Sequence, residues 1–137
     1  MRTLALFLLA ALAIAQAPSS FRSVGTVSQL MIDIIYPASD AIFYVERAAP
    51  QNDKEWNSLR GTALVLAESG NLLMMSDRAR DQGDWMKDAK MLVDVGTLAY
   101  RAAQAKDLAG ILALNDQLNA ACVVCHQQYR PGYRRRQ

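Results

Sequence analysis

The stretch from residue 56 to residue 73 carries apolar and small residues at alternating intervals of three and four positions: Trp56, Leu59, Ala63, Leu66, Gly70 and Leu73. Residues at this spacing share one face of an α-helix, so the stretch predicts a helix with one buried side. Comparable stripes run through residues 31–45, 85–103 and 108–122. No alternating strand pattern of useful length accompanies them, and the sequence therefore predicts an all-α fold of four helices.

Capping and helix-breaking residues set the expected boundaries. Thr26 and Gln29 have the spacing of a capping box, and Asp53 is the expected N-cap of the second helix. Pro37 is expected to kink or split the first helix. A polar loop at 76–83 precedes the third helix, and the fourth is expected to run as one helix over 108–130. Short connections favour antiparallel neighbours, which predicts an antiparallel up-down-up-down four-helix bundle.

Residues 1–15 have the features of a secretory signal peptide. Arg2 precedes an apolar run over 4–13, and small residues follow in the A-x-A arrangement of a cleavage site. The run is shorter than the roughly twenty residues that a membrane-spanning helix needs, although an uncleaved anchor is the alternative. We expect cleavage after Ala15, a mature domain of residues 16–137 and a periplasmic location. Nothing later in the sequence is expected to cross a membrane.

The pentad Cys122-Val123-Val124-Cys125-His126 lies near the C-terminus. In an exported protein this C-x-x-C-H pattern predicts covalent attachment of one haem c, with both thiols adding to haem vinyl groups and the imidazole binding the iron. The chain has two cysteines and one histidine, too few for a four-ligand zinc site. A thioredoxin-type dithiol would follow a strand, and none is predicted here. A chance motif or a simple disulfide is the remaining alternative.

The expected topology also brings methionines to the level of His126. In an up-down-up-down bundle the end of the fourth helix is level with the start of the first, the end of the second and the start of the third. The methionines at those places are Met31, Met74, Met75 and Met86. Methionines commonly fill space in a core, so this placement alone assigns none of them to the iron.

The leader, the four helices and the pentad followed by Tyr129 and Arg130 resemble the cytochrome c′ family and its low-spin relatives of the cytochrome c-556 type, the four-helix-bundle class II c-type cytochromes. Only the pentad and the basic residue four positions after the histidine match as a motif. The resemblance implies a haem inside the bundle, held by the last helix, with its sixth coordination position facing the first helix. That position is apolar in the high-spin branch and a methionine in the low-spin branch.

The resemblance implies roles for several residues. His126 becomes the proximal ligand and Met31 the distal ligand, the rivals being an open sixth position or another methionine. Arg130 becomes a partner of a haem propionate or of the proximal face, although a cation is also favoured near a helix C-terminus by the dipole alone. Tyr129 is expected to pack against the proximal haem. Arg78 and Arg80 are further candidates for the propionates.

These expectations favour a small periplasmic carrier of single electrons, because thioether ligation raises the reduction potential of haem iron. The alternative is a five-coordinate haem protein that binds NO or CO. An enzyme is not expected, since the single histidine is already committed to the proximal side. The formal net charge of +2 falls to about +1 without Arg2 and gives no case for nucleic acid.

The expected partner is a periplasmic redox protein. The basic tail Arg134-Arg135-Arg136 would suit an acidic partner, although such a tail is more often a solvated terminus. Homodimers paired through the first helix are common among proteins of this resemblance.

Overall fold

The computed structural model describes residues 21–130 and 132, and within this part every regular element is helical, which confirms the all-α prediction. The expected signal peptide at 1–15 and the basic tail lie outside the described residues. The elements are the helix α1 (Val27–Leu30), the π-helical turn η1 (Met31–Ile35), α2 (Tyr36–Phe43), the 3-10 turn η2 (Val45–Ala48), α3 (Asp53–Leu73), α4 (Asp84–Gln104), α5 (Leu108–Leu112) and α6 (Asn115–Tyr129).

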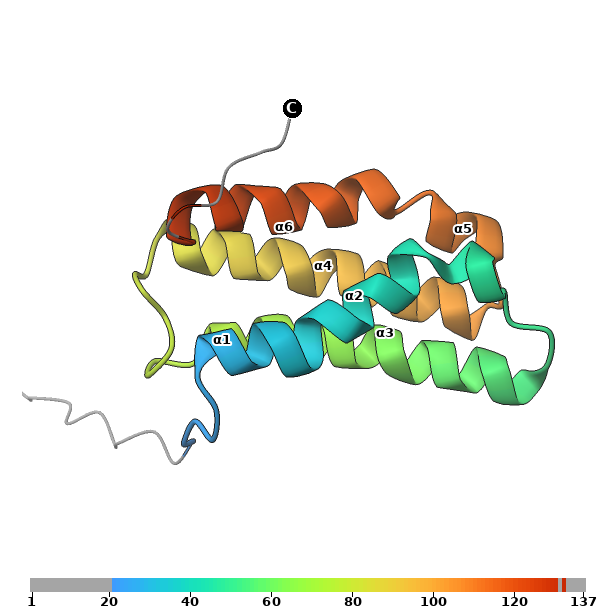
Figure 1. Cartoon of the computed structure of the whole chain (residues 1–137), viewed down its shortest axis with the longest axis horizontal. Helices are drawn as coiled ribbons and strands as arrows, with labels where there is room; N and C mark the ends of the chain where they lie inside the picture. Colours follow the sequence, from blue (N-terminus) through green and yellow to red (C-terminus); the bar gives the residue numbers. More distant parts are fainter. Residues whose placement is uncertain (1–20, 131, 133–137) are drawn as a thin grey trace, which may run out of the picture.

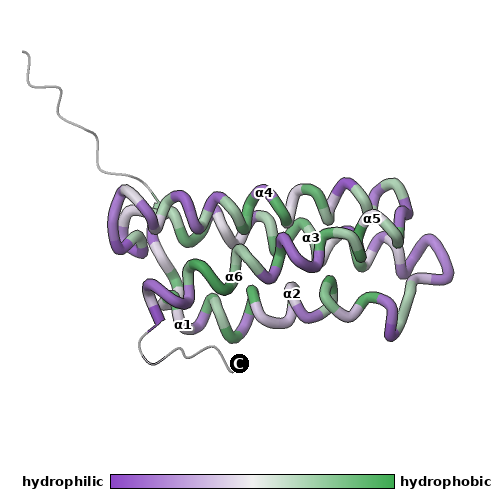
Figure 2. Tube along the Cα trace, turned by 90° about the horizontal axis from the view of Figure 1, so that it is seen from above, coloured by the Kyte–Doolittle hydropathy of each residue, from purple (hydrophilic) through white to green (hydrophobic). Residues whose placement is uncertain are grey.

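Figure 1 shows four long helical segments lying side by side. The first of them, which we call the first rod, consists of α1, η1 and α2 in succession. The start of α1, the connection between α3 and α4 and the end of α6 lie at one end of the bundle, and α5 lies at the other. In Figure 2 the loops at both ends are mostly hydrophilic, while hydrophobic segments recur along the long helices.

The capping box at the start of α1 is confirmed. The Thr26 hydroxyl accepts a hydrogen bond from the Gln29 amide at 3.2 Å, and the Gln29 side chain accepts one from the Thr26 amide at 2.9 Å. Pro37 does not split the first rod. The helix continues through it, and the turn directly before it is widened into the π-helical turn η1, where the Tyr36 amide donates to the Met31 carbonyl.

Two expected boundaries are wrong. The N-cap of α3 is Asn52, whose side chain accepts from the Glu55 amide at 3.1 Å, and Asp53 is instead the first helical residue. Asp53 pairs with Lys106, at 2.7 Å between carboxylate oxygen and ammonium nitrogen. The helix expected over 108–130 is divided into α5 and α6 by a turn at residues 113–114.

Helices α3 and α4 pack closely because glycines stand at their contact. A Cβ atom on Gly96 would lie 2.7 Å from the backbone of Ala67, and one on Gly70 would lie 2.9 Å from the carbonyl oxygen of Ala89. Real Cβ atoms do not approach other atoms so closely, so the absence of a side chain at both positions permits the short distance between the helices. Both glycines belong to the inward stripes expected from the sequence.

One helical stretch among the described residues, Leu108–Tyr129, has the length and apolar composition of a membrane-spanning helix. The expectation that no later stretch would meet this criterion is therefore wrong. In the structure the stretch is broken between α5 and α6, and Asn115 and Asp116 follow the break. Core helices of water-soluble proteins meet the same criterion, so composition alone does not place this stretch in a membrane.

Candidate functional site

A cavity of about 820 Å³ lies between the first rod and α6, with α4 contributing a further wall. This volume is within the roughly 300–1,000 Å³ that is typical of ligand and cofactor sites. Six of the residues expected at the site line it together: Met31, Cys122, Cys125, His126, Tyr129 and Arg130. The structure therefore brings the pentad of α6 and the methionine of the first rod to one cavity.

The pentad lies on α6 with its chemical groups on the cavity side. Cys122 and Cys125 are half-buried free thiols, and His126 is also half-buried. Burial raises the pKa of Cys122, and burial together with Asp88 and Cys122 raises the pKa of Cys125 to about 11. Burial, followed by the positive charge of Arg130, lowers the pKa of His126. A neutral imidazole is the form that binds a metal ion, so this environment favours His126 as a ligand.

Met31 begins the π-helical turn η1 and is half-buried against the core. Of the methionines expected near the level of His126, Met31 is the one that lines the cavity within the described part of the chain. Met74 and Met86 pack against the core without lining the cavity, and the Met75 sulfur accepts a hydrogen bond from Arg78 at 3.0 Å. The structure thus distinguishes Met31 from the other candidate methionines, because Met31 lines the cavity that contains His126.

The three candidate arginines occupy different environments. Arg80 and Arg130 are exposed and line the cavity, where they place positive charge at its edge. Arg78 is buried and does not line it. Its guanidinium donates to the Gly25 carbonyl at 3.2 and 3.1 Å and to the Leu72 carbonyl at 3.1 Å. Arg78 therefore ties the chain before α1 to the end of α3, and the structure gives it no place beside a group in the cavity.

Tyr129 fastens the end of α6 beside the cavity. Its hydroxyl donates a hydrogen bond to the Asp81 carboxylate, and its ring meets Trp85 edge-on, with ring centroids 4.9 Å apart. The hydrogen bond to Asp81 raises the pKa of Tyr129 to about 12 and lowers that of Asp81. Trp85 is buried, and its indole N–H donates to the Leu73 carbonyl at 2.8 Å. This network joins α6 to α4 and to the loop that precedes α4.

Sequence analysis missed Asp88, a carboxylate of α4 that lines the cavity. Asp88 is only 6% exposed, and its buried Oδ2 atom has no hydrogen-bond partner among the described residues. Burial raises the pKa of Asp88, and the carboxylates of Asp84 and Asp81 raise it further. The available signal was its spacing, because Asp88 falls between Trp85 and Leu92 at intervals of three and four on the inward face.

The rest of the lining combines apolar surface with positive charge and with the carboxylates of Asp40 and Asp88. Ile35, Phe43, Leu73, Ala89, Leu92 and Ala121 supply apolar surface, and Arg80 and Arg130 supply positive charge. The imidazole of His126 and the thioether of Met31 are the nitrogen and sulfur ligands that haem iron accepts, and the thiols are placed for covalent attachment. No cluster of three or more His, Cys, Asp or Glu suited to a metal ion occurs among residues 21–130 and 132. The residues present thus fit a covalently held haem.

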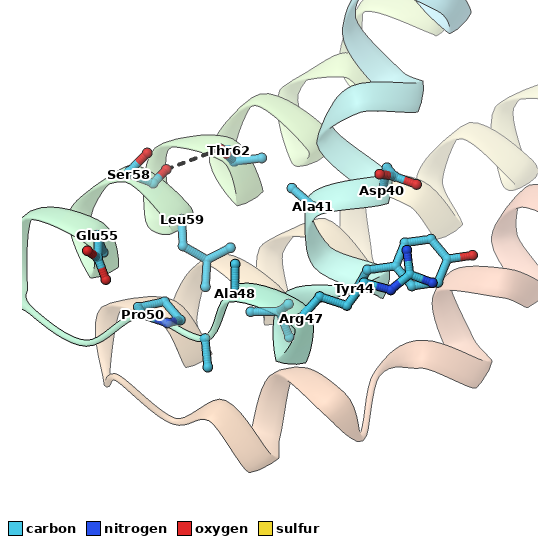
Figure 3. A pocket seen from close by; sticks show the side chains of 12 residues that line it. Asp40, Ala41, Tyr44, Arg47, Ala48, Pro50, Glu55, Ser58, Leu59 and Thr62 are labelled. Carbon is cyan, nitrogen blue, oxygen red and sulfur yellow. Dashed lines mark hydrogen bonds between the residues drawn. The ribbon is translucent and has the colours of Figure 1, made fainter.

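A second hollow, of about 570 Å³, lies between the end of α2, the 3-10 turn η2 with the loop after it, and the start of α3 (Figure 3). The Arg47 guanidinium lies over the Tyr44 ring, 3.7 Å from its centroid. Asp40 and Tyr44 line both this hollow and the larger cavity. None of the site residues expected from the sequence lines the second hollow.

Comparisons with protein-family models, with curated proteins and with solved structures found no match for the chain.

Proposed function

We propose that the protein is a periplasmic c-type cytochrome that transfers single electrons. In this proposal an antiparallel up-down-up-down bundle holds one haem c, attached through Cys122 and Cys125, with His126 and Met31 as the iron ligands. The observation that supports it most directly is that a single cavity of about 820 Å³ is lined by all four of these residues. The periplasmic location rests on the sequence of residues 1–15.

A bound haem would supply reversible one-electron chemistry between Fe(II) and Fe(III). The chain contributes the environment for it. The thioether of Met31 is a soft ligand that favours the reduced state, while His126 presents an imidazole whose lowered pKa keeps it neutral. Apolar side chains supply much of the lining, and the exposed Arg80 and Arg130 are placed to neutralise acidic substituents.

The same residues support a carrier over a catalyst. Cleavage of an O–O bond needs a distal acid or base, and the only histidine of the chain lines the α6 side of the cavity as the expected proximal ligand, which leaves carboxylates such as Asp88, and the arginines, as ionisable groups for such chemistry. The first rod faces the cavity with a thioether at Met31. Because a carrier must exchange electrons with another protein, the proposed partner is another periplasmic redox protein, which would exchange electrons with the bound haem.

The first test is the optical spectrum of the holoprotein, purified from a periplasm that performs c-type haem attachment. We expect a sharp low-spin spectrum on reduction, the weak long-wavelength band of methionine-bound iron on oxidation, and no response to CO. Met31→Ala should abolish that band and open the iron to CO. Met86→Ala, which alters a half-buried methionine that does not line the cavity, should leave the spectrum unchanged.

Covalent attachment is tested by the double variant Cys122→Ser with Cys125→Ser, which should retain no haem after denaturation. A high-spin wild-type spectrum that shifts with CO would contradict ligation by Met31 and favour binding of NO or CO. If the wild type retains no haem after denaturation, then the proposal as a whole is wrong.

A further inference from the structure

The residues of the first rod that line the cavity recur every four positions: Val27, Met31, Ile35, Ser39 and Phe43. Each is followed by a residue that also lines it. This repeat is not the repeat of an α-helix. With 3.6 residues in each turn, a step of four overshoots one turn by about 40°. Over the four steps from Val27 to Phe43 a regular α-helix would drift by about 160°, which would turn Phe43 almost away from a cavity that faces Val27.

The π-helical turn η1 counteracts this drift. The Tyr36 amide donates to the Met31 carbonyl, five positions earlier, so the turn holds one residue more than a turn of α-helix. Each residue in such a wide turn advances by a smaller angle, and a step of four then returns more nearly to the same face. Met31 and Ile35 are the first and last residues of η1, and both line the cavity.

Pro37 supplies a physical cause for the wide turn. Proline has no amide hydrogen to donate, and its ring clashes with the carbonyl four positions earlier, which here belongs to Asp33. Pro37 is the second residue of α2, one position after the first residue beyond η1, and is itself exposed and absent from the cavity lining. The Tyr36 carbonyl next to it accepts a hydrogen bond from the buried Ser39 hydroxyl at 3.0 Å, so the helix resumes within one turn.

We infer that Pro37 is a positioning residue for Met31: by widening the preceding turn, it keeps Met31 on the face of the first rod that lines the cavity. The inference concerns the direction of the rod's face. The consequence of this inference for iron ligation rests on the proposed function. The hydrogen-bond pattern of η1 can be tested without that function.

The test is Pro37→Ala in the holoprotein, with Pro50→Ala as the matched control in the loop before α3. Alanine is a better helix former than proline, so the variant is expected to remain folded. In its crystal structure the Tyr36 amide should donate to the Ile32 carbonyl in place of the Met31 carbonyl, and the Met31 side chain should leave the cavity. The band of methionine-bound iron should be lost, and CO should bind as it does to Met31→Ala. Pro50→Ala should keep the wild-type bond and band.

The two proposals fail in different ways. If the wild type lacks the methionine–iron band, ligation by Met31 is wrong, and the acceptor of the Tyr36 amide still decides the inference about Pro37. If Pro37→Ala keeps the Tyr36-to-Met31 hydrogen bond with Met31 in the cavity, then Pro37 does not cause the wide turn that directs Met31 to the cavity. The inference is then overturned.

Discussion

The contact between α3 and α4 and the contact between the first rod and α6 are built from residues of opposite size. Gly70 and Gly96 bring α3 and α4 so close that an added Cβ would overlap the neighbouring helix. Met31 and Phe43 of the first rod line the cavity with long side chains, and Asn115 donates to the Phe43 carbonyl at 3.5 Å. The helix pair with glycines at its contact packs closely, whereas the pair lined by large side chains borders the cavity.

The largest expected effect on stability comes from adding a side chain to the close contact between α3 and α4. Gly96→Val places atoms within the backbone of Ala67, and overpacking of this kind costs about 3 kcal/mol. We expect a corresponding fall in the free energy of unfolding, measured in urea. The matched control is Gly61→Ala on α3, where an added Cβ meets nothing within 4 Å. It should stabilise the protein by about 0.5–1 kcal/mol, and equal losses in both variants would contradict the close packing.

A smaller effect is expected from Asp88, the buried carboxylate of α4 that lines the cavity, because an unpaired buried polar group costs about 1–3 kcal/mol. The raised pKa of Asp88 means that the folded protein holds this proton more tightly than the unfolded chain does. Its contribution to stability therefore falls as the pH rises from the ordinary aspartate value through the raised value. Asp88→Asn should remove this fall, so that the variant gains on the wild type with increasing pH.

The measurement for Asp88 is the free energy of unfolding of both proteins across the acid and neutral range. Asp94→Asn changes an exposed carboxylate of the same helix, which pairs with Lys90 at 2.6 Å. This control should not reproduce the gain at higher pH. Parallel curves for wild type and Asp88→Asn would show that the buried carboxylate does not contribute to the pH dependence.

The smallest effect is expected from the helix caps, where a lost N-cap costs about 1 kcal/mol. Thr26→Ala removes the capping box of α1, in the first rod that borders the cavity. Asn52→Ala removes the N-cap of α3, which packs closely against α4. We expect similar losses of stability from both. Amide hydrogen exchange should separate them, with faster exchange in the first rod for Thr26→Ala alone. Faster exchange along the first rod in both variants would show that the first rod and the contact between α3 and α4 are not stabilised independently.

Local features of the fold were predictable from the sequence because they depend on near neighbours. The capping box at Thr26 and the inward stripes of α3 and α4 follow from spacings of three and four residues. The N-cap of α3 was placed one residue late, since Asn52 and Asp53 are both favourable caps and only the path of the backbone separates them. The break between α5 and α6 was missed because the apolar spacing continues across it.

The candidate site was predictable where a motif carries its own chemistry, as the pentad does. The choice of Met31 among the methionines near that level depends on which side chains the packing turns toward the cavity, and spacing alone left it open. Arg78 was a further candidate for the propionates, yet the route of the loop after α3 directs it to backbone carbonyls. Asp88 was missed because a carboxylate on an inward stripe is easily taken for an exposed residue.

The buried Arg78 has a consequence for the order in which the cavity is assembled. Helices α3 and α4 are neighbours in the chain, whereas Arg78 joins a carbonyl 53 residues away. Closing so long a loop costs more conformational entropy than forming a helical hairpin. We therefore expect the hairpin to form early and the first rod to dock late. The wall of the cavity that carries Met31 is then the last part of the cavity to be assembled.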